Sequence, residues 1–294
     1  MKRLINLTEF LRYYPDRLAR FVLRFYGYKS FFVETAIVKH HVYSFKDKGS
    51  LPPLYILHGG SDSAASYLPV LLRLRHKFSE VVVVEAGGHG LSGELKDPYT
   101  FDAHYSSTFT VLDKLIKKGG PAIIFGNSLG GLTALHYAVN SPDRVKGLFL
   151  TSPMGAPMTE EMLNDLRDIF TPADLKETAI FTNRVLHKPP LLGAYVVNRL
   201  TYIRITQPAI MDLIYATSTD DGISAQQLKA IKAPVFMICG RSDRIITHNA
   251  CRFFKDNLAN ATIIRPNAVG HCPHIERPKF LANKVVEFAT GLSE

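Results

Sequence analysis

The feature that most constrains this chain is a serine flanked by glycines at the junction of an apolar run and a helical pattern. Residues Ala122–Phe125 are short, β-branched and aromatic, as in a buried strand, and residues 129–139 have helical spacing. Gly126 and Gly130 lie two residues before and two residues after Ser128. Larger side chains at these flanking positions collide with strand and helix in so sharp a turn. The pattern predicts a turn that presents Ser128 as a nucleophile; a Gly-rich structural turn is the alternative.

A serine is a weak nucleophile until a base accepts its proton, so this interpretation requires a histidine. The candidate is His271, in a loop that follows the expected strand Thr262–Ile264. The carboxyl ends of strands in open α/β sheets meet at the edge where Ser128 would also emerge. His274 is the competitor, three residues later. We favour His271, because Gly270 permits a tight approach, and expect His274 to be a surface or capping group.

The histidine needs a carboxylate to orient it, and Asp243 is the candidate. It follows the apolar run Val235–Cys239 and a short turn, again at the end of an expected strand. A carboxylate there accepts the Nδ1–H of His271 and leaves Nε2 free to take the serine proton. The alternative is that Asp243 caps the helix starting near Thr247 or pairs with a neighbouring arginine. The order Ser, Asp, His along the chain favours the triad.

Donors for the oxyanion are expected where the apolar strand Leu54–Leu57 ends in a His-Gly-Gly-Ser sequence. The bare backbone of two consecutive glycines approaches a substrate closely. We predict that the N–H of Leu129 and one N–H from Gly60 or Ser61 hold the tetrahedral intermediate. His58 is expected to be structural.

With these motifs the chain resembles the serine α/β-hydrolase superfamily along nearly its whole length. The resemblance implies an ester-hydrolysing triad of Ser128, Asp243 and His271 that needs no cofactor. One departure is Glu85, where the family usually carries aspartate at a structural position. The motifs that carry the resemblance are His58–Gly60, Glu85–Ser92, Gly126–Gly130, Gly240–Asp243, Gly270–His271 and Glu276–Pro278.

Within the superfamily the chain looks most like the monoacylglycerol-lipase-like and carboxylesterase branch, by the stretches Leu150–Gly155 and Ile231–Pro234. We therefore expect a serine esterase or lipase acting on an apolar acyl ester. The Gly-Asn-Ser elbow also resembles carbon–carbon bond hydrolases of the meta-cleavage-product type, which normally carry a tryptophan that this chain lacks. A catalytically inactive hydrolase-like binding module is the third possibility.

The order of elements predicts an α/β-hydrolase fold: an eight-stranded, mostly parallel sheet with an antiparallel start and helices on both faces. Residues 31–153 and 231–294 form the expected core, and residues 154–230 a helical cap. The expected strands are Phe31–Val38, His41–Phe45, Leu54–Leu57, Val81–Glu85, Ala122–Phe125, Leu148–Thr151, Val235–Cys239 and Thr262–Ile264. The expected cap helices are Glu160–Phe170, Pro172–Thr182 and Leu191–Thr201, and the cap side chains considered for the acyl pocket are Phe170, Phe181, Tyr195, Tyr202, Ile203, Met211 and Ile214.

Residues 1–30 form a basic amphipathic segment that is expected to be helical, with Pro15 starting a second helix. Residues 1–50 hold ten Lys or Arg and four Asp or Glu, so most of the net charge of +9 lies here. A basic helix with aromatics suits an anionic membrane surface, which residues 1–27 would contact. A solvated helix docked on the domain is the equal alternative. No motif points to nucleic acid.

We expect a cytoplasmic protein, either free or peripherally bound to a membrane. Arginines interrupt the N-terminal apolar residues, which excludes a secretory signal, and no run approaches the length of a membrane span. Three cysteines are too few for a disulfide framework, which fits a reducing compartment. The histidines lack a set of partners for a metal, and we predict neither metal nor cofactor.

Overall fold

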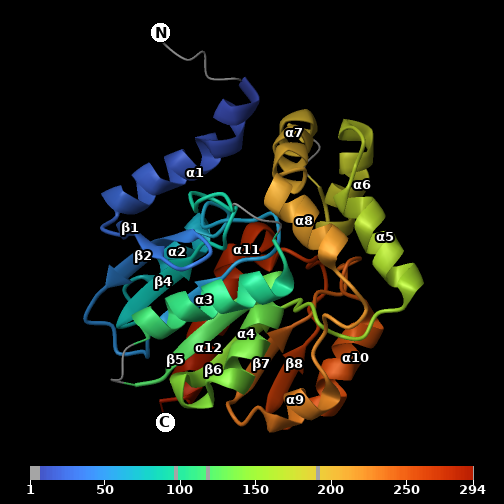
Figure 1. Cartoon of the computed structure of the whole chain (residues 1–294). Helices are drawn as coiled ribbons and strands as arrows, with labels where there is room; N and C mark the ends of the chain where they lie inside the picture. Colours follow the sequence, from blue (N-terminus) through green and yellow to red (C-terminus); the bar gives the residue numbers. More distant parts are fainter. Residues whose placement is uncertain (1–6, 96–98, 117–119, 190–192, 294) are drawn as a thin grey trace.

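The computed structural model describes residues 7–95, 99–116, 120–189 and 193–293. In these residues the strands form one eight-stranded sheet in the order β1-β2-β4-β3-β5-β6-β7-β8 (Figure 1). Every neighbouring pair between β4 and β8 in this spatial order is parallel. The strands are β1 Lys29–Glu34, β2 Lys39–Lys46, β3 Leu54–Leu57, β4 Glu80–Val84, β5 Ala122–Asn127, β6 Val145–Thr151, β7 Val235–Ile238 and β8 Ala261–Ile264.

The antiparallel start of the sheet is the hairpin of β1 and β2, followed by β2 against β4. The expected strand Phe31–Val38 is wrong at its end, because β1 stops at Glu34. Thr35 closes a turn there: its N–H donates to the carbonyl of Val38 at 3.1 Å, and its side-chain oxygen accepts from the N–H of Val38 at 3.1 Å. A hydroxyl that bonds to nearby backbone competes with the sheet ladder and ends the strand.

Helices cover both faces of the sheet, because alternate residues of the buried strands point to opposite sides. Tyr55 and Leu57 of β3 contribute to one core, and Leu54 and Ile56 to the other. The predicted α/β-hydrolase fold is therefore confirmed. The first core also contains α3 Phe101–Leu115, α4 Leu129–Asn140, α9 Ala225–Ala230 and α10 His248–Asn257, and the second contains α2 Leu68–Leu74 and α12 Pro278–Gly291.

Four helices lie beyond the carboxyl ends of the strands: α5 Glu160–Phe170, α6 Leu175–Val185, α7 Ala194–Ile205 and α8 Pro208–Ala216 (Figure 1). The bounds of α5 match the prediction. The second cap helix begins later than predicted, because Asp174 caps it by accepting from the N–H groups of Lys176 and Glu177. Part of the expected helix Leu191–Thr201 lies outside the described residues. α9, at the end of the range assigned to the cap, packs against α4 and α10 of the core instead.

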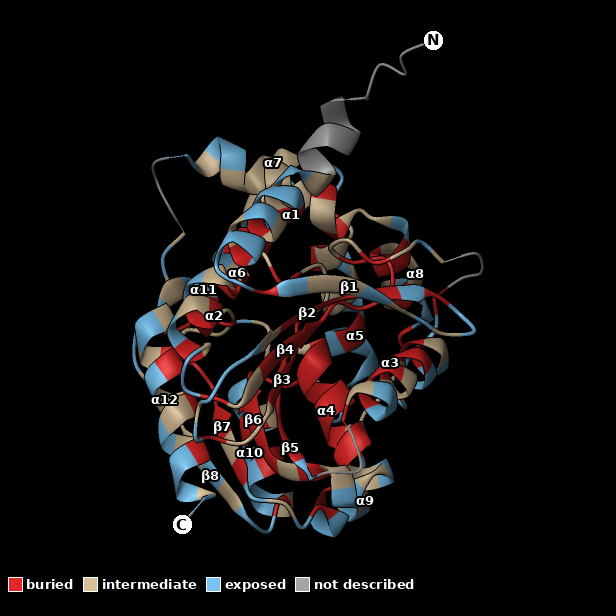
Figure 2. Ribbon diagram, turned by 90° about the vertical axis from the view of Figure 1, so that its left-hand side faces the viewer, coloured by how far each residue is buried: buried red, intermediate tan, exposed pale blue. Residues whose placement is uncertain are grey.

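The N-terminal segment is one helix, α1 Leu7–Phe25, with Pro15 inside it, so the expected second start at Pro15 is wrong. Contacts with α7 and β1 hold this helix on the body despite the proline. Asp16, Ala19 and Leu23 form its buried side. Figure 2 shows exposed residues along its outer side. Among the described residues, no helix combines the length and apolar character needed to cross a bilayer.

Candidate active site

Ser128 sits at the turn between the buried strand β5 and helix α4, as predicted. Its backbone has φ 50° and ψ −116°, a region that side-chain-bearing residues rarely adopt. The flanking glycines are required by space. A Cβ on Gly126 would lie 2.3 Å from the carbonyl oxygen of Gly130, and one on Gly130 would lie 2.2 Å from that of Leu57. The chain is thus forced into a tight turn that places Ser128 on the wall of two cavities.

The structure brings His271 and Asp243 together, although 28 residues separate them. His271 Nδ1 lies 2.9 Å from Asp243 Oδ2, and both side chains are nearly inaccessible to solvent. Burial alone would raise the pKa of Asp243, but the neighbouring His271 and the hydrogen bonds to the carboxylate outweigh it and hold this pKa below its usual value. An ionised Asp243 accepts the Nδ1–H of His271, which leaves Nε2 free to accept a proton.

Asp243 also shapes its own loop. Its second oxygen, Oδ1, accepts from the N–H groups of Ile245 at 2.8 Å and Ile246 at 3.0 Å. The helix cap of α10 is Thr247 rather than Asp243. Asp243 therefore does not cap α10, which was the alternative considered from the sequence. It closes a turn just before that helix with Oδ1, and Oδ2 remains available to His271.

Asn127, to which the sequence analysis assigned no role, ties the serine turn to the histidine loop. Its amide Nδ2 donates to the carbonyl oxygens of Thr151 at 3.0 Å and His271 at 3.2 Å. The N–H of His271 in turn donates to the carbonyl of Val185, at the end of cap helix α6, at 2.7 Å. The backbone of His271 is thus fixed to both β5 and the cap. The signal that the sequence offered is an amide side chain directly before the serine.

The predicted oxyanion donors lie around the same turn. Leu129 is the first residue of α4, so its N–H has no partner within the helix. Gly60 and Ser61 line a cavity together with Ser128. A Cβ on the neighbouring Gly59 would lie 2.9 Å from Asn127 Oδ1, so the loop after β3 touches the turn after β5. The geometry is suitable for backbone donors from both loops to converge near Ser128.

His58 holds this loop in place, as expected. Its Nε2 accepts from the N–H of Ala86 at 3.0 Å, and its Nδ1 lies 2.8 Å from the carbonyl oxygen of Gly59. Because a backbone N–H donates and a carbonyl accepts, the ring is the neutral tautomer protonated at Nδ1. The ring joins the ends of β3 and β4 and has no nitrogen available for proton transfer.

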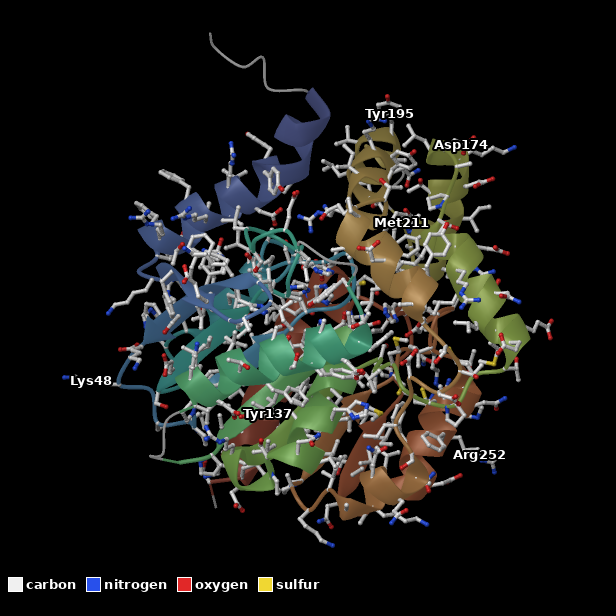
Figure 3. All side chains as sticks on the ribbon, viewed as in Figure 1. Lys48, Tyr137, Asp174, Tyr195, Met211 and Arg252 are labelled. Carbon is white, nitrogen blue, oxygen red and sulfur yellow. The ribbon has the colours of Figure 1, made fainter. Side chains whose placement is uncertain are left out.

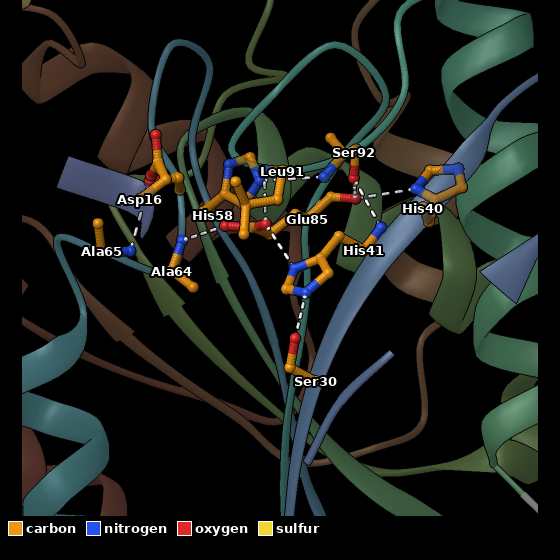
Figure 4. A network of polar contacts seen from close by, with 12 residues as sticks. Asp16, Ser30, His40, His41, His58, Ala64, Ala65, Glu85, Leu91 and Ser92 are labelled. Carbon is orange, nitrogen blue, oxygen red and sulfur yellow. Dashed lines mark hydrogen bonds and ion pairs between the residues drawn. The ribbon is translucent and has the colours of Figure 1, made fainter. Parts of the chain in front are cut away.

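Glu85 is the second support of this loop (Figure 4). It is fully buried, and its Oε1 accepts from the N–H of Ala64 at 3.0 Å while Oε2 accepts from the N–H of Leu91 at 2.9 Å. Oε2 also lies 2.9 Å from Nδ1 of His41. A Cβ on Gly90 would lie 2.2 Å from Oε1, so the longer acidic side chain is accommodated by a glycine. Glu85 therefore links the loops after β3 and β4.

His274, the competitor for the base, is a structural residue in the interior, and the expectation of a surface position is wrong. It is fully buried and stacks on Tyr67, with ring centroids 4.1 Å apart. Its Nε2 lies 3.0 Å from Asp62 Oδ2. Asp62 belongs to the loop that carries Gly60 and Ser61, so the ring supports that loop from behind.

Two cavities beneath the cap meet at Ser128. One has a volume of about 150 Å³ and the other about 330 Å³. Of the cap residues considered either for a pocket or for helix packing, three line these cavities: Phe170, Phe181 and Ile214. Tyr202, Ile203 and Met211 line neither of the two. Tyr195 takes neither role, because it is 71% exposed at the outer end of α7, where Figure 3 labels it. Helical spacing predicts a face but not which element that face meets.

No three His, Cys, Asp or Glu side chains among the described residues lie close enough together to hold a metal ion. Cys272 follows His271 on the wall of the larger cavity. Burial raises the pKa of its thiol well above the usual value, so this group stays protonated near neutral pH and is a poor nucleophile.

Comparison with known proteins agrees with the fold. The family described as serine aminopeptidase, S33, matches residues 53–278. Lipase 3 from Moraxella sp. (strain TA144) is 24% identical, over 86% of this chain and 82% of its own. Monoacylglycerol lipase ABHD6 from Homo sapiens is 22% identical, over 95% of this chain and 88% of its own. Carboxylesterase CesB from Bacillus subtilis superposes with a TM-score of 0.77 at 21% identity, covering 96% of this chain and 98% of its own. The resemblance noted from the sequence is confirmed.

Proposed function

Since the chain belongs to the serine aminopeptidase S33 family of α/β-hydrolases, we propose that it is a serine hydrolase of apolar, lipid-like carboxylic esters. The observation that carries the proposal is the buried pair of His271 and Asp243, 2.9 Å apart, beside a cavity that Ser128 also lines. Lipases and esterases among the relatives support the choice of esters.

In the proposed mechanism, Ser128 Oγ attacks the ester carbonyl carbon while His271 Nε2 takes its proton. The oxyanion that forms accepts from the N–H of Leu129 and one N–H of Gly60 or Ser61. The intermediate collapses as His271 gives the proton to the leaving alkoxy oxygen, which departs as an alcohol. Water then attacks the acyl-enzyme with His271 as base, releasing the acid and restoring Ser128. Asp243 holds the ring and stabilises its cationic form.

Peptide hydrolysis is a weaker candidate for the same site. A free carboxylate at the site would bind the ammonium group of an aminopeptidase substrate through charge-assisted hydrogen bonds. Among the described residues, the acidic side chains that line the two cavities are already paired. Asp62 contacts His274 at 3.0 Å, and Asp165 is bound to Arg184 at 2.8 Å. The cavity walls are otherwise mainly apolar.

The test is labelling of the folded chain by a fluorophosphonate, combined with hydrolysis of p-nitrophenyl esters. We expect labelling and turnover in the wild type, both lost in Ser128→Ala and both retained in Ser106→Ala, an exposed serine on α3. A vinylogous diketone and an aminoacyl anilide serve as rival substrates. Ester hydrolysis that survives Ser128→Ala unchanged, or faster turnover of a rival substrate, would refute the proposal.

We also propose that the outer side of α1 rests on an anionic lipid surface. Tyr14, Leu18, Phe21 and Phe25 form one apolar stripe on this helix, and Phe21 and Phe25 are 70% and 77% exposed. Arg17 and Arg24 are exposed beside the stripe. An apolar face flanked by arginines, on a helix docked by its opposite face, matches the requirements of an interfacial helix.

Vesicle sedimentation of the full chain tests this contact. We expect binding to vesicles containing phosphatidylglycerol and weaker binding to phosphatidylcholine alone. Phe21→Glu with Phe25→Glu should abolish it, whereas Tyr215→Glu, at an aromatic on α8 that is 63% exposed, should not. If the double substitution leaves vesicle binding intact, or instead dissolves a dimer seen by analytical ultracentrifugation, the stripe serves another partner.

A further inference from the structure

The two cavities under the cap share a narrow set of residues. Gly60, Ser128 and Phe170 line both of them. The smaller cavity, of about 150 Å³, continues toward α5 and α8, and the larger one, of about 330 Å³, toward α6 and α7. A substrate whose reacting carbon lies at Ser128 can therefore extend in two directions.

The position of His271 distinguishes the two directions chemically. His271 lines the larger cavity and not the smaller one. In ester cleavage the histidine must deliver its proton to the leaving oxygen, and proton transfer requires hydrogen-bonding distance. The alcohol part of the ester is therefore on the side of His271, in the larger cavity. The acyl part, which stays on Ser128, extends into the smaller cavity beside Leu129.

Most polar side chains on the wall of the larger cavity already form hydrogen bonds or ion pairs with other residues of the chain. Arg204 contacts buried Asp16 of α1 at 3.2 Å and donates to Ser63 at 3.1 Å. Asp62 is held by His274, and the hydroxyl of Thr182 donates to Asn198 at 3.0 Å. The remaining wall is largely apolar, with Phe181, Val185, Leu186, Val197, Leu200 and Ile275. Such a wall favours an apolar alcohol over a polyol, because it offers few free hydrogen-bonding groups.

The smaller cavity is apolar as well but has less room. Three methionines, Met154, Met158 and Met162, contribute to its wall with Ile210 and Ile214. Methionine side chains adapt to the shape of a partner, so an acyl chain of moderate length can be accommodated there.

We propose that the preferred substrates are esters of a bulky apolar alcohol with a shorter acyl group, and that the alcohol occupies the larger cavity. This inference rests on the proposed function, because it requires Ser128 to be acylated and His271 to protonate the alcohol. It separates this site from one built for a long acyl chain and a small polar alcohol such as glycerol.

Isomeric esters test the assignment, because they have the same atoms and differ only in which side is large. Nonyl acetate is compared with methyl decanoate, and phenethyl acetate with methyl hydrocinnamate, as kcat/KM below the solubility limit. We expect the acetate of each pair to be preferred at least about tenfold, since even one methylene that lacks space costs about that much.

Two substitutions then narrow one cavity each. Leu200→Trp on α7 should shift the ratio of nonyl acetate to methyl decanoate at least about tenfold toward methyl decanoate, and Ile214→Trp on α8 should shift it toward nonyl acetate. Tyr195→Trp, on the exposed end of α7, should leave the ratio unchanged. Thr201→Leu is a milder filling of the larger cavity, to be used if Leu200→Trp fails to fold.

Fluorophosphonate labelling of Ser128 is measured on every variant, so that failures are distinguishable. Labelling together with a preference for methyl decanoate and methyl hydrocinnamate overturns this inference alone. The same holds if both cavity substitutions move the ratio in one direction. Absence of both labelling and ester turnover in the wild type overturns the proposed function and this inference with it.

Discussion

The turn that carries Ser128 and the cap above it are stabilised in different ways. The turn follows a strand in the middle of the sheet, with β3 and β6 as neighbours, and its glycines have no space for a Cβ. The N–H of Ser128 donates to the carbonyl of Thr151 at 3.1 Å. Packing and backbone hydrogen bonds thus restrict this region to one arrangement.

Polar contacts of single side chains hold the cap, both within itself and to the rest of the chain. Arg204 of α7 contacts Asp16 of α1. Within the cap itself, Arg167 donates to the carbonyl of Thr217 at 2.6 Å, and Arg184 binds Asp165 near the solvent. Exposed apolar side chains such as Ile180 and Tyr195 lie on the cap helices. The difference teaches that the chemistry and the choice of substrate are separable: changes at the turn should affect catalysis or folding, whereas changes in the cap should affect selectivity.

The largest effect is expected at the proposed catalytic groups. His271→Ala should lower kcat by about 10⁶-fold, and Asp243→Asn by about 10⁴-fold, because the ring then loses its acceptor for Nδ1–H. Steady-state ester hydrolysis measures both. Residues that act as one unit are not additive, so adding His271→Ala to Ser128→Ala should cost little more. Independent, multiplying losses would contradict the triad.

Gly130→Ala tests how tightly the turn is packed. Its Cβ would meet the carbonyl oxygens of Leu57 and His58 at 2.2 and 2.5 Å, both backbone atoms that cannot move aside easily. We expect the free energy of unfolding to fall by about 3 kcal/mol in chemical denaturation. Gly291→Ala, at the end of α12 with open space around it, is the matched control and should be neutral or slightly stabilising. Equal losses of stability in Gly130→Ala and Gly291→Ala would contradict the tight packing of the turn.

Acid should lower the free energy of unfolding, because two buried histidines, His89 and His104, resist protonation in the folded protein. Burial and the neighbouring His58 lower the pKa of His89 to about 3, and burial lowers that of His104 as well. Between the ordinary histidine pKa and the lowered pKa of the folded state, the unfolded chain binds more protons than the folded chain. The free energy of unfolding therefore falls as the pH decreases through this range. At pH 5 the loss is about 2 kcal/mol for His89.

Thermal unfolding between pH 7 and pH 5 measures this effect. His89→Asn, whose amide can replace the hydrogen bond from Nδ1 to the carbonyl of Gly87, should reduce the pH dependence. His248→Asn, at an exposed position on α10, is the control and should leave it unchanged. If both variants lose as much stability between pH 7 and pH 5 as the wild type, groups other than His89 cause the acid sensitivity.

The smallest effect is expected in the cap. The Asp165 side chain is 54% exposed, so its ion pair with Arg184 is screened by solvent. Asp165→Ala should cost less than about 1 kcal/mol in denaturation experiments, and salt should reduce the difference. A loss as large as that of Gly130→Ala would show that the cap is held as tightly as the turn.

Local patterns in the sequence were sufficient for the sheet, the turn at Ser128 and helix α5, since strand and helix periodicity and glycine requirements act over a few neighbouring residues. Local patterns failed where distant segments meet. Pro15 remains within α1 because that helix docks through Asp16, Ala19 and Leu23. The early end of β1 has a local cause instead, because Thr35 closes a turn with Val38 only three residues later.

The two histidines that follow β8 show the same division most clearly. The sequence by itself determined that a histidine would follow this strand at the edge where Ser128 emerges. Only the tertiary structure decided that His274 stacks on Tyr67 and bonds to Asp62, while His271 meets Asp243 and lines the larger cavity. Those partners lie far away along the chain, and the volumes of the two cavities likewise depend on how separate helices pack, which no local pattern encodes.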